Sequence, residues 1–163
     1  MKFVSITKEN YNQVAEIYKE GLATKMATFE TQVPNWDQWN KKFLPFCRIA
    51  LVLKNEVLGW ATLTAVSPRA VYRGVAEVTI YIKSSDQQKG LGKLLLDELI
   101  TQSEQQGIWS LQASIFRGNN VSIRLHKKCG FRVLGYKEKI ARRDGIWHDT
   151  FILERRSRVV GVS

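Results

Sequence analysis

The chain has 163 residues, 44% of them hydrophobic and 25% charged, with a formal net charge of +10 at pH 7, as expected for one basic globular domain. No apolar run approaches the ~18 residues of a membrane span, and the first residues, MKFVSITKEN, lack the apolar core of a signal peptide. Cys47 and Cys129 are far apart in the sequence, so we expect reduced thiols in a cytoplasmic protein and no metal site.

The N-terminal segment is predicted to form two helices. Apolar side chains recur every three or four residues from Tyr11 to Leu22, which indicates an amphipathic first helix. Thr7 precedes this segment and is predicted to be its N-cap. A second, shorter helix is predicted after Asn35, which is also a favourable N-cap residue, and Trp36 would lie on its apolar side.

Three strands are predicted next. Residues 48–54 and 57–64 are rich in apolar residues and are separated by Asn55-Glu56, so they should pair as a hairpin. Residues 75–83, VAEVTIYIK, form the third predicted strand because β-branched side chains dominate it.

A helix with a strongly apolar face follows a glycine-containing turn. Leu91, Leu94, Leu95 and Leu99 are predicted to share that face, and Gly107 is a plausible stop. Most of the excess positive charge lies in this second half of the chain. A basic surface of this kind suits a nucleic acid or a phosphate-rich small molecule, and a solvated cationic surface is the alternative.

The remaining elements complete a mixed domain. Residues 110–116 are predicted to form a strand and residues 119–128 a helix. Residues 131–141 and 147–154 are predicted to form a closing hairpin that turns at the sequence RRDG. This order of helices and strands predicts an α/β or α+β domain with a mixed central sheet. The last residues, RRSRVVGVS, are predicted to be a frayed basic tail.

The turn before the apolar helix has the composition of an anion site. The first N–H groups of a helix have no partner within it, and the helix dipole favours an anion there. Gly90 and Gly92 allow the main chain to approach a ligand closely, and Lys89 and Lys93 add positive charge. These features predict a site for a pyrophosphate.

Two familiar phosphate loops do not fit this turn. The dinucleotide fingerprint G-x-G-x-x-G requires a small residue where Leu95 stands, and the Walker loop requires Ser or Thr where Leu94 stands. The remaining pattern is Q-x-x-G-x-G, from Gln87 to Gly92. Taken alone, it is equally consistent with a tight turn that binds nothing.

A second motif, N-x-x-S-x-x-L-H-x-x-x-G-F, runs from Asn119 to Phe131. Together with the Q-x-x-G-x-G turn, it resembles the GNAT superfamily of N-acetyltransferases. The likeness extends over about residues 2–155, so we expect one domain over residues 1–155 and a basic tail over 156–163. Four segments further resemble the phosphinothricin and methionine sulfoximine N-acetyltransferase group, namely residues 17–31, 69–82, 113–131 and 144–153.

This resemblance implies the GNAT fold, a mixed central sheet flanked by helices, with a splayed parallel strand pair that binds acetyl-CoA. It implies no metal. Backbone groups of Ile80, Tyr81 and Ile82 would contact the pantetheine arm and the acetyl carbonyl. Asn119, Ser122 and Lys128 would provide further contacts to acetyl-CoA. The residues implied around the pyrophosphate are Gln87, Gln88, Lys89, Gly90, Leu91, Gly92 and Lys93.

The resemblance also implies two candidate catalytic residues. An α-amino group is largely protonated at pH 7 and must lose a proton before it attacks a thioester. Glu77 would be the base, acting through water with a pKa raised by partial burial, and a structural carboxylate is the alternative. His126 would act as an acid or in a proton relay, and a structural histidine is the alternative. A backbone N–H near Tyr81 would stabilise the oxyanion.

The acceptor would be a small molecule with an amine. Phe29 and Tyr72 could wall its pocket, and Glu30 could meet the cationic amine. Arg69 or Arg73 could pair with a carboxylate or phosphinate group. Trp147 and Asp149 lie on the closing hairpin, which related proteins use in the acceptor pocket or in a dimer contact.

Two other functions remain open at this point. The first is acetylation of a protein or peptide, for instance a ribosomal N-terminus. The second is a nucleic-acid-binding module driven by the net charge of +10, although no recognised binding motif or clustered stacking aromatics support it. A homodimer is expected from the resemblance.

Overall fold

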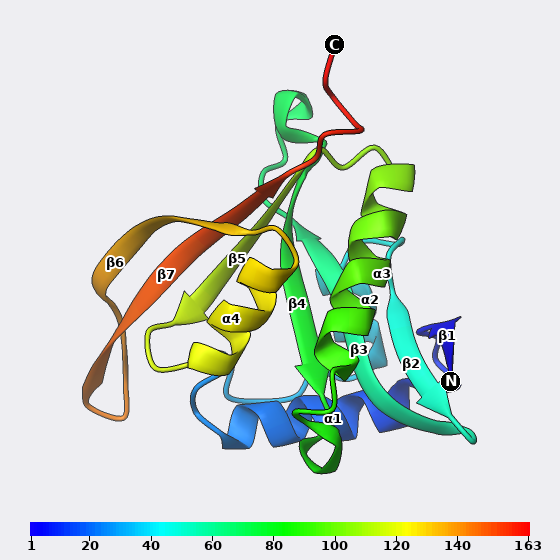
Figure 1. The fold of residues 1–163 in the computed structure, drawn as a ribbon. Coiled ribbons are helices and arrows are strands. Elements are labelled where there is room, and N and C mark those ends of the chain that lie inside the picture. The colour runs from blue at the N-terminus through cyan, green and yellow to red at the C-terminus, as the bar shows by residue number, and fades with distance from the viewer.

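A seven-stranded sheet forms the centre of the computed structural model, which describes all of residues 1–163 (Figure 1). All neighbouring strands are antiparallel except β4 and β5, which are parallel. The predicted mixed sheet with a parallel pair is therefore confirmed. In spatial order the strands are β1 (Lys2–Ser5), β2 (Ile49–Leu53), β3 (Glu56–Ala65), β4 (Val75–Ile82), β5 (Ser110–Phe116), β7 (Ile146–Arg156) and β6 (Arg132–Arg143).

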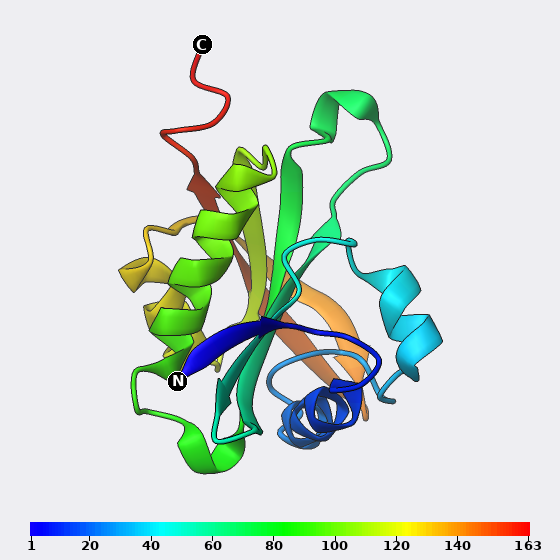
Figure 2. The same cartoon turned by 90° about the vertical axis from the view of Figure 1, so that its right-hand side faces the viewer.

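Helices cover both faces of the sheet (Figure 2). On one face lie α1 (Tyr11–Ala23) and α2 (Trp36–Lys42), and on the other lie α3 (Leu91–Gln105) and α4 (Asn120–Lys128). Each face has its own apolar cluster, and the larger one packs under α3. No helix is long and apolar enough to span a bilayer.

Two predicted helix details are corrected. The N-cap of α1 is Asn10 rather than Thr7, and the Asn10 side chain accepts a hydrogen bond from the Thr7 backbone N–H at 2.9 Å. Leu94 is 49% exposed and does not share the buried face of α3 with Leu91, Leu95 and Leu99. By contrast, Asn35 caps α2 as predicted, in a reciprocal capping box with Gln38.

Both predicted hairpins are present, and their turns use residues in the left-handed region. Asp144 and Gly145 form the β6–β7 turn, with φ of 52° and 78°. The β2–β3 turn falls at Lys54-Asn55, one residue earlier than predicted, with φ of 49° and 67°. The first strand, β1, is absent from the sequence prediction because its four residues are too short for a clear alternation.

The first residues of the C-terminal segment contact the rest of the domain. Ser157 is only 4% exposed, and its hydroxyl donates a hydrogen bond to Glu104 Oε1 at 2.9 Å. Arg156 donates to the carbonyl oxygens of Val160 and Gly161 at 2.9 and 2.5 Å. The chain therefore folds back beside Trp109 after β7, because this arginine satisfies the carbonyls of the turn.

Candidate active site

The parallel strands β4 and β5 separate after a short paired segment. They pair only from Val75 with Ser110 to Glu77 with Gln112, and beyond Glu77 the ribbons diverge (Figure 1). On its other side, β4 stays paired with β3 as far as Ile82. The backbone groups of residues 78–82 that face β5 consequently have no strand partner, and such an edge favours an extended ligand.

The glycine turn lies at the end of this gap, between β4 and α3 (Figure 1). Gly90 is the N-cap residue of α3, with φ of 80° and no side-chain cap. A Cβ at Gly90 would meet no atom within 4 Å, whereas a Cβ at Gly92 would lie 3.1 Å from Leu125 of α4. The open helix N-terminus therefore faces a space without side chains, which fits a phosphate.

Two lysines flank this helix N-terminus. Lys89 pairs with Asp86 at 2.9 Å, and Lys93 pairs with Asp97 at 2.5 Å. Both ammonium groups are largely exposed, and exposed ion pairs of this kind contribute little stability. The lysines are therefore available to a polyanionic ligand at low cost. Gln87 donates to the Ile82 carbonyl at 3.4 Å, and Gln88 has a positive φ of 61°.

Glu77 stands where the gap opens. Its side chain keeps contact with solvent, but the surrounding protein still raises the pKa of Glu77 above the ordinary carboxyl value through desolvation. The ammonium groups of Lys137 and Lys42 and the Ser114 hydroxyl oppose this shift. A carboxyl with a raised pKa at the end of a cleft is suited to proton transfer.

Helix α4 lines the other side of the gap. The Asn119 side chain accepts from the Ser122 N–H at 3.2 Å, so it caps α4, and its amide donates to the Met26 carbonyl at 3.4 Å. His126 is only 2% exposed, and its Nδ1 lies 2.7 Å from the Ser122 carbonyl oxygen. Lys128 is exposed at the end of the helix.

The environment of His126 favours the neutral imidazole. A carbonyl oxygen only accepts hydrogen bonds, so Nδ1 carries the ring proton and Nε2 is left as an acceptor. Burial among the α4 and Phe131 side chains lowers the pKa of His126. No hydrogen bond joins it to Glu77.

These features match a known family. Residues 3–152 match the acetyltransferase (GNAT) domain. The chain belongs to the GNAT family. It is an acetyl-CoA-dependent N-acetyltransferase, and the fold and the co-substrate expected from the sequence are confirmed.

Within the GNAT family, this chain is similar to characterised acetyltransferases and to proteins with solved structures. The L-methionine sulfoximine/L-methionine sulfone acetyltransferase of Pseudomonas aeruginosa is 31% identical over 133 residues, which cover 82% of this chain and 73% of the relative. The phosphinothricin N-acetyltransferase of Alcaligenes faecalis is 30% identical over 151 residues, covering 87% and 75%. A phosphinothricin acetyltransferase from Sinorhizobium meliloti, solved with acetyl-CoA, superposes with a TM-score of 0.89 at 25% identity, covering 99% of this chain and 91% of that one.

The residues of this GNAT domain fit acetyl-CoA. The unpaired edge of β4 suits the amide groups of the pantetheine arm, and the uncapped N-terminus of α3 suits the pyrophosphate. No group of three or more His, Cys, Asp and Glu side chains comes together as a metal site. Cys47 and Cys129 are unpaired and buried, and burial raises the pKa of each thiol to about 11. Neither cysteine is therefore a thiolate at neutral pH.

Tyr81 has a second role that the sequence did not reveal. Its ring stacks on Tyr18 at 5.1 Å and contacts Trp60 at 5.2 Å, and burial raises its pKa. A Cβ at Gly21 of α1 would lie 2.4 Å from this ring. The side chain therefore ties β4 to α1, while its main chain borders the gap.

Residues 24–31, which follow α1, form a segment here called the acceptor loop. Phe29 packs against Phe116 with ring centroids 4.3 Å apart and against His148 at 5.7 Å. Together with Phe116 and His148, Phe29 therefore forms an aromatic wall at the end of β5. Glu30 pairs with Lys42 at 2.9 Å, so its charge is already balanced.

The RAVYR segment lies near the other end of β4. Tyr72 lines a surface hollow together with Gln112, the strand partner of Glu77. Arg73 instead packs its guanidinium over the Trp109 ring at 5.5 Å, and Arg69 is exposed. The structure thus places Tyr72 and these arginines near the paired end of β4 and β5, whereas Phe29 lies at the far end of β5.

The closing hairpin lines a small hollow at the end of β5, where Trp147 and Asp149 lie near Met26 and Phe116. Trp147 is 53% exposed and lies under the Arg142 guanidinium at 5.8 Å. Asp149 binds the Tyr136 hydroxyl, the Arg117 guanidinium and the Lys139 N–H. These partners hold the pKa of Asp149 below its usual value, chiefly through Tyr136. Asp149 is therefore a structural carboxylate of the hairpin bulge.

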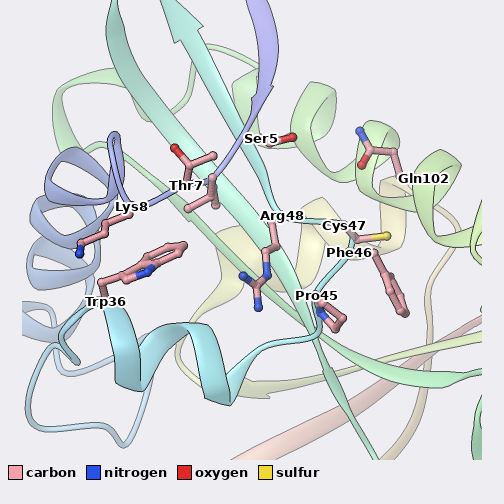
Figure 3. A pocket seen from close by; sticks show the side chains of 10 residues that line it. Ser5, Thr7, Lys8, Trp36, Pro45, Phe46, Cys47, Arg48 and Gln102 are labelled. Carbon is pink, nitrogen blue, oxygen red and sulfur yellow. The ribbon is translucent and has the colours of Figure 1, made fainter.

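A separate hollow lies between the end of β1, α2 and the segment before β2 (Figure 3). Arg48 points into it, but its guanidinium already donates to the carbonyls of Asn40, Phe43 and Leu44, at 2.9, 2.9 and 2.6 Å. Its Nη1 also donates to Asn40 Oδ1. Four of the five guanidinium N–H groups are therefore used at the C-terminal end of α2, and a single one remains for an anion. We place no site there.

Proposed function

We propose that the protein acetylates the amine of a small amino acid or amino-acid analogue of the phosphinothricin, methionine sulfoximine or methionine sulfone type. The observation that carries this proposal is the position of Glu77 at the point where β4 and β5 separate. The relatives named for these acceptors support the choice of acceptor class.

Acetyl-CoA is proposed to bind along the open edge of β4. The main chains of Ile80, Tyr81 and Ile82 would contact the pantetheine arm, with further contacts from Asn119, Ser122 and Lys128. The unpaired strand edge and the uncapped helix support this arrangement. The pyrophosphate would bind the turn formed by Gln87, Gln88, Lys89, Gly90, Leu91, Gly92 and Lys93.

Glu77 is proposed to act as general base through a water molecule. It removes a proton from the acceptor's ammonium group, and the neutral nitrogen then attacks the acetyl carbonyl. The new C–N bond forms and the C–S bond breaks. The leaving CoA thiolate takes up the second proton that the nitrogen loses, so the products are the amide and the CoA thiol. A backbone N–H near Tyr81 would stabilise the oxyanion. For His126, a neutral ring with Nε2 free favours a role as proton acceptor in a relay over a role as acid.

The acceptor is proposed to bind between the acceptor loop and the RAVYR segment, residues 69–73. Phe29 and Tyr72 would wall the pocket, and Trp147 would border it on the hairpin. Arg69 or Arg73 would have to turn toward the gap to pair with a carboxylate or phosphinate. Glu30 would have to exchange Lys42 for the acceptor's amine, which is inexpensive because the pair is exposed.

Acetyl-CoA is expected to raise the melting temperature, because it binds the folded chain only. At 100 times Kd, the gain of about 2.7 kcal/mol corresponds to roughly 5–10 °C for a domain of this size. The measurement is a thermal melt with acetyl-CoA, with NADH as a pyrophosphate-containing control. A thiol-release screen then tests phosphinothricin, methionine sulfoximine, methionine sulfone, the common amino acids and N-terminal peptides.

The outcomes of this screen separate the alternatives. Release with small amines supports the proposal, and release only with peptides supports a protein N-acetyltransferase. No release from any amine contradicts the catalytic proposal even if the melt shifts. Salt-dependent DNA binding without a thermal shift would instead support the nucleic-acid-binding alternative.

We also propose that two copies associate through the β6–β7 hairpin in the cytoplasm. Its apolar side chains remain exposed in one chain, namely Val133, Leu134, Tyr136, Ile140, Ile146 and Trp147. Light scattering is expected to give twice the mass of 18.7 kDa, and Ile146→Lys should shift the protein toward the monomer. Ile146 is not in the gap, and Val159→Lys, exposed beyond β7, is the matched control. A monomeric native protein at micromolar concentration would contradict this proposal.

A further inference from the structure

The tip of the β6–β7 hairpin contacts the acceptor loop. The hairpin extends from the sheet to the level of α1 in both views (Figures 1 and 2). Arg143, at the end of β6, donates from Nη1 to the Thr28 carbonyl at 2.6 Å and from Nη2 to the Lys25 carbonyl. More than 110 residues of sequence separate the partners of each of these bonds.

Arg143 also completes the aromatic wall. Its guanidinium carbon lies 5.8 Å from the Phe29 ring centroid and 5.7 Å from that of Phe116. Because the guanidinium is planar, it donates in its plane to two carbonyls and presents its face to the rings. The side chain is half-buried in this position.

The other long-range ties of the acceptor loop are weaker. Lys25 pairs with Asp144 at 3.3 Å and Glu30 pairs with Lys42 of α2 at 2.9 Å, but these four side chains are 37–68% exposed. The Asn119 amide reaches the Met26 carbonyl at 3.4 Å, near the limit for a hydrogen bond. Exposed ion pairs contribute little. Arg143 is therefore the main polar tie between this loop and the rest of the domain.

We propose that Arg143 is a positioning residue for the acceptor. By binding the Lys25 and Thr28 carbonyls, it holds Phe29 against Phe116 and His148 and so sets the shape of the aromatic wall. The inference rests on the proposed function only in assigning that wall to the acceptor site. Acetyl-CoA would bind beside α3 and α4, and Arg143 itself contacts none of the residues proposed to hold it.

Kinetics of Arg143→Gln test the proposal. With methionine sulfone as probe, the KM for the acceptor is expected to rise about tenfold, the effect of losing one or two charged hydrogen bonds. The KM for acetyl-CoA should stay within about twofold. Arg143→Lys should recover part of the loss, because an ammonium group replaces only one of the two bonds.

The matched control is Arg142→Gln. Arg142 precedes Arg143, carries the same charge and makes no hydrogen bond to the acceptor loop. Both acceptor and acetyl-CoA KM values should remain native in this variant. Equal kinetics for the two glutamine variants would overturn the proposal.

Limited trypsin digestion gives a second readout that needs no substrate. Cleavage after Lys25, followed by mass spectrometry, should be several-fold faster in Arg143→Gln than in the native protein or in Arg142→Gln. Unchanged cleavage would show that Arg143 does not hold the loop, and the proposal would fail. Faster cleavage with native acceptor KM would overturn the assignment of the wall to the acceptor. If no amine releases thiol from the native enzyme, the proposed function fails separately.

Discussion

Glu77→Gln is expected to lower kcat about 100-fold at neutral pH, the lower end of the usual contribution of a general base. The amide keeps the shape of the carboxyl but cannot accept a proton from the acceptor's ammonium group. Since the main chain of β4 is unaffected, the KM for acetyl-CoA should remain within about twofold. Steady-state thiol release with each substrate varied in turn measures both quantities.

The pH profile provides a second test of the same residue. Desolvation raises the pKa of Glu77, and the base works only when deprotonated. Activity should therefore fall as the pH drops through a pKa above the ordinary carboxyl value, and this acidic limb should disappear in Glu77→Gln. Glu138→Gln, an exposed carboxylate on β6, is the matched control and should keep the limb. Native turnover in Glu77→Gln would remove Glu77 as the base.

Gly21→Ala is expected to lower the free energy of unfolding by about 2 kcal/mol, as overpacked core positions do. In an ordinary helix interior the same change would stabilise by about 1 kcal/mol. Here the new Cβ would lie 2.4 Å from the Tyr81 ring. Tyr18 and Trp60 pack against that ring, so it cannot move aside freely. A melting temperature lower by about 4–8 °C should result.

A double-mutant cycle separates this clash from other effects. In a Tyr81→Ala background the clash is absent, so Gly21→Ala should become neutral or stabilising. Gly135→Ala on β6, where a Cβ meets nothing within 4 Å, is the control in the native background. A stabilised Gly21→Ala single variant would contradict the packing described for α1 and β4.

Much of the fold could be predicted from local signals. The strands of the β2–β3 and β6–β7 hairpins, the Asn35 cap and the strand–turn–helix unit around Gly90 each depend on residues close in sequence. The errors have physical causes as well. Leu94 follows the apolar period of α3 yet faces away from the sheet, and the end of β7 is held by contacts with Glu104 that no local pattern reports.

The site was predictable where it depends on a motif and unpredictable where it depends on tertiary contacts. The turn residues are proposed from a sequence motif, and Glu77 is proposed from the family resemblance. The break in pairing after Glu77 depends on two strands that approach from different parts of the chain. Arg143 bonds to Lys25 and Thr28 across more than a hundred residues, so its interaction with the acceptor loop had no signal in the sequence.

The brief pairing of β4 with β5 also has a mechanical consequence. Strands β1–β4 form one leaf of the sheet and strands β5–β7 form the other, and three residue pairs are their only backbone ladder. An extended ligand in the gap would act as a removable strand that bridges the leaves. The contact between the two parts of the sheet would then be stronger while the ligand is bound and weaker after it leaves. The stiffness of the domain would therefore depend on whether the gap is occupied.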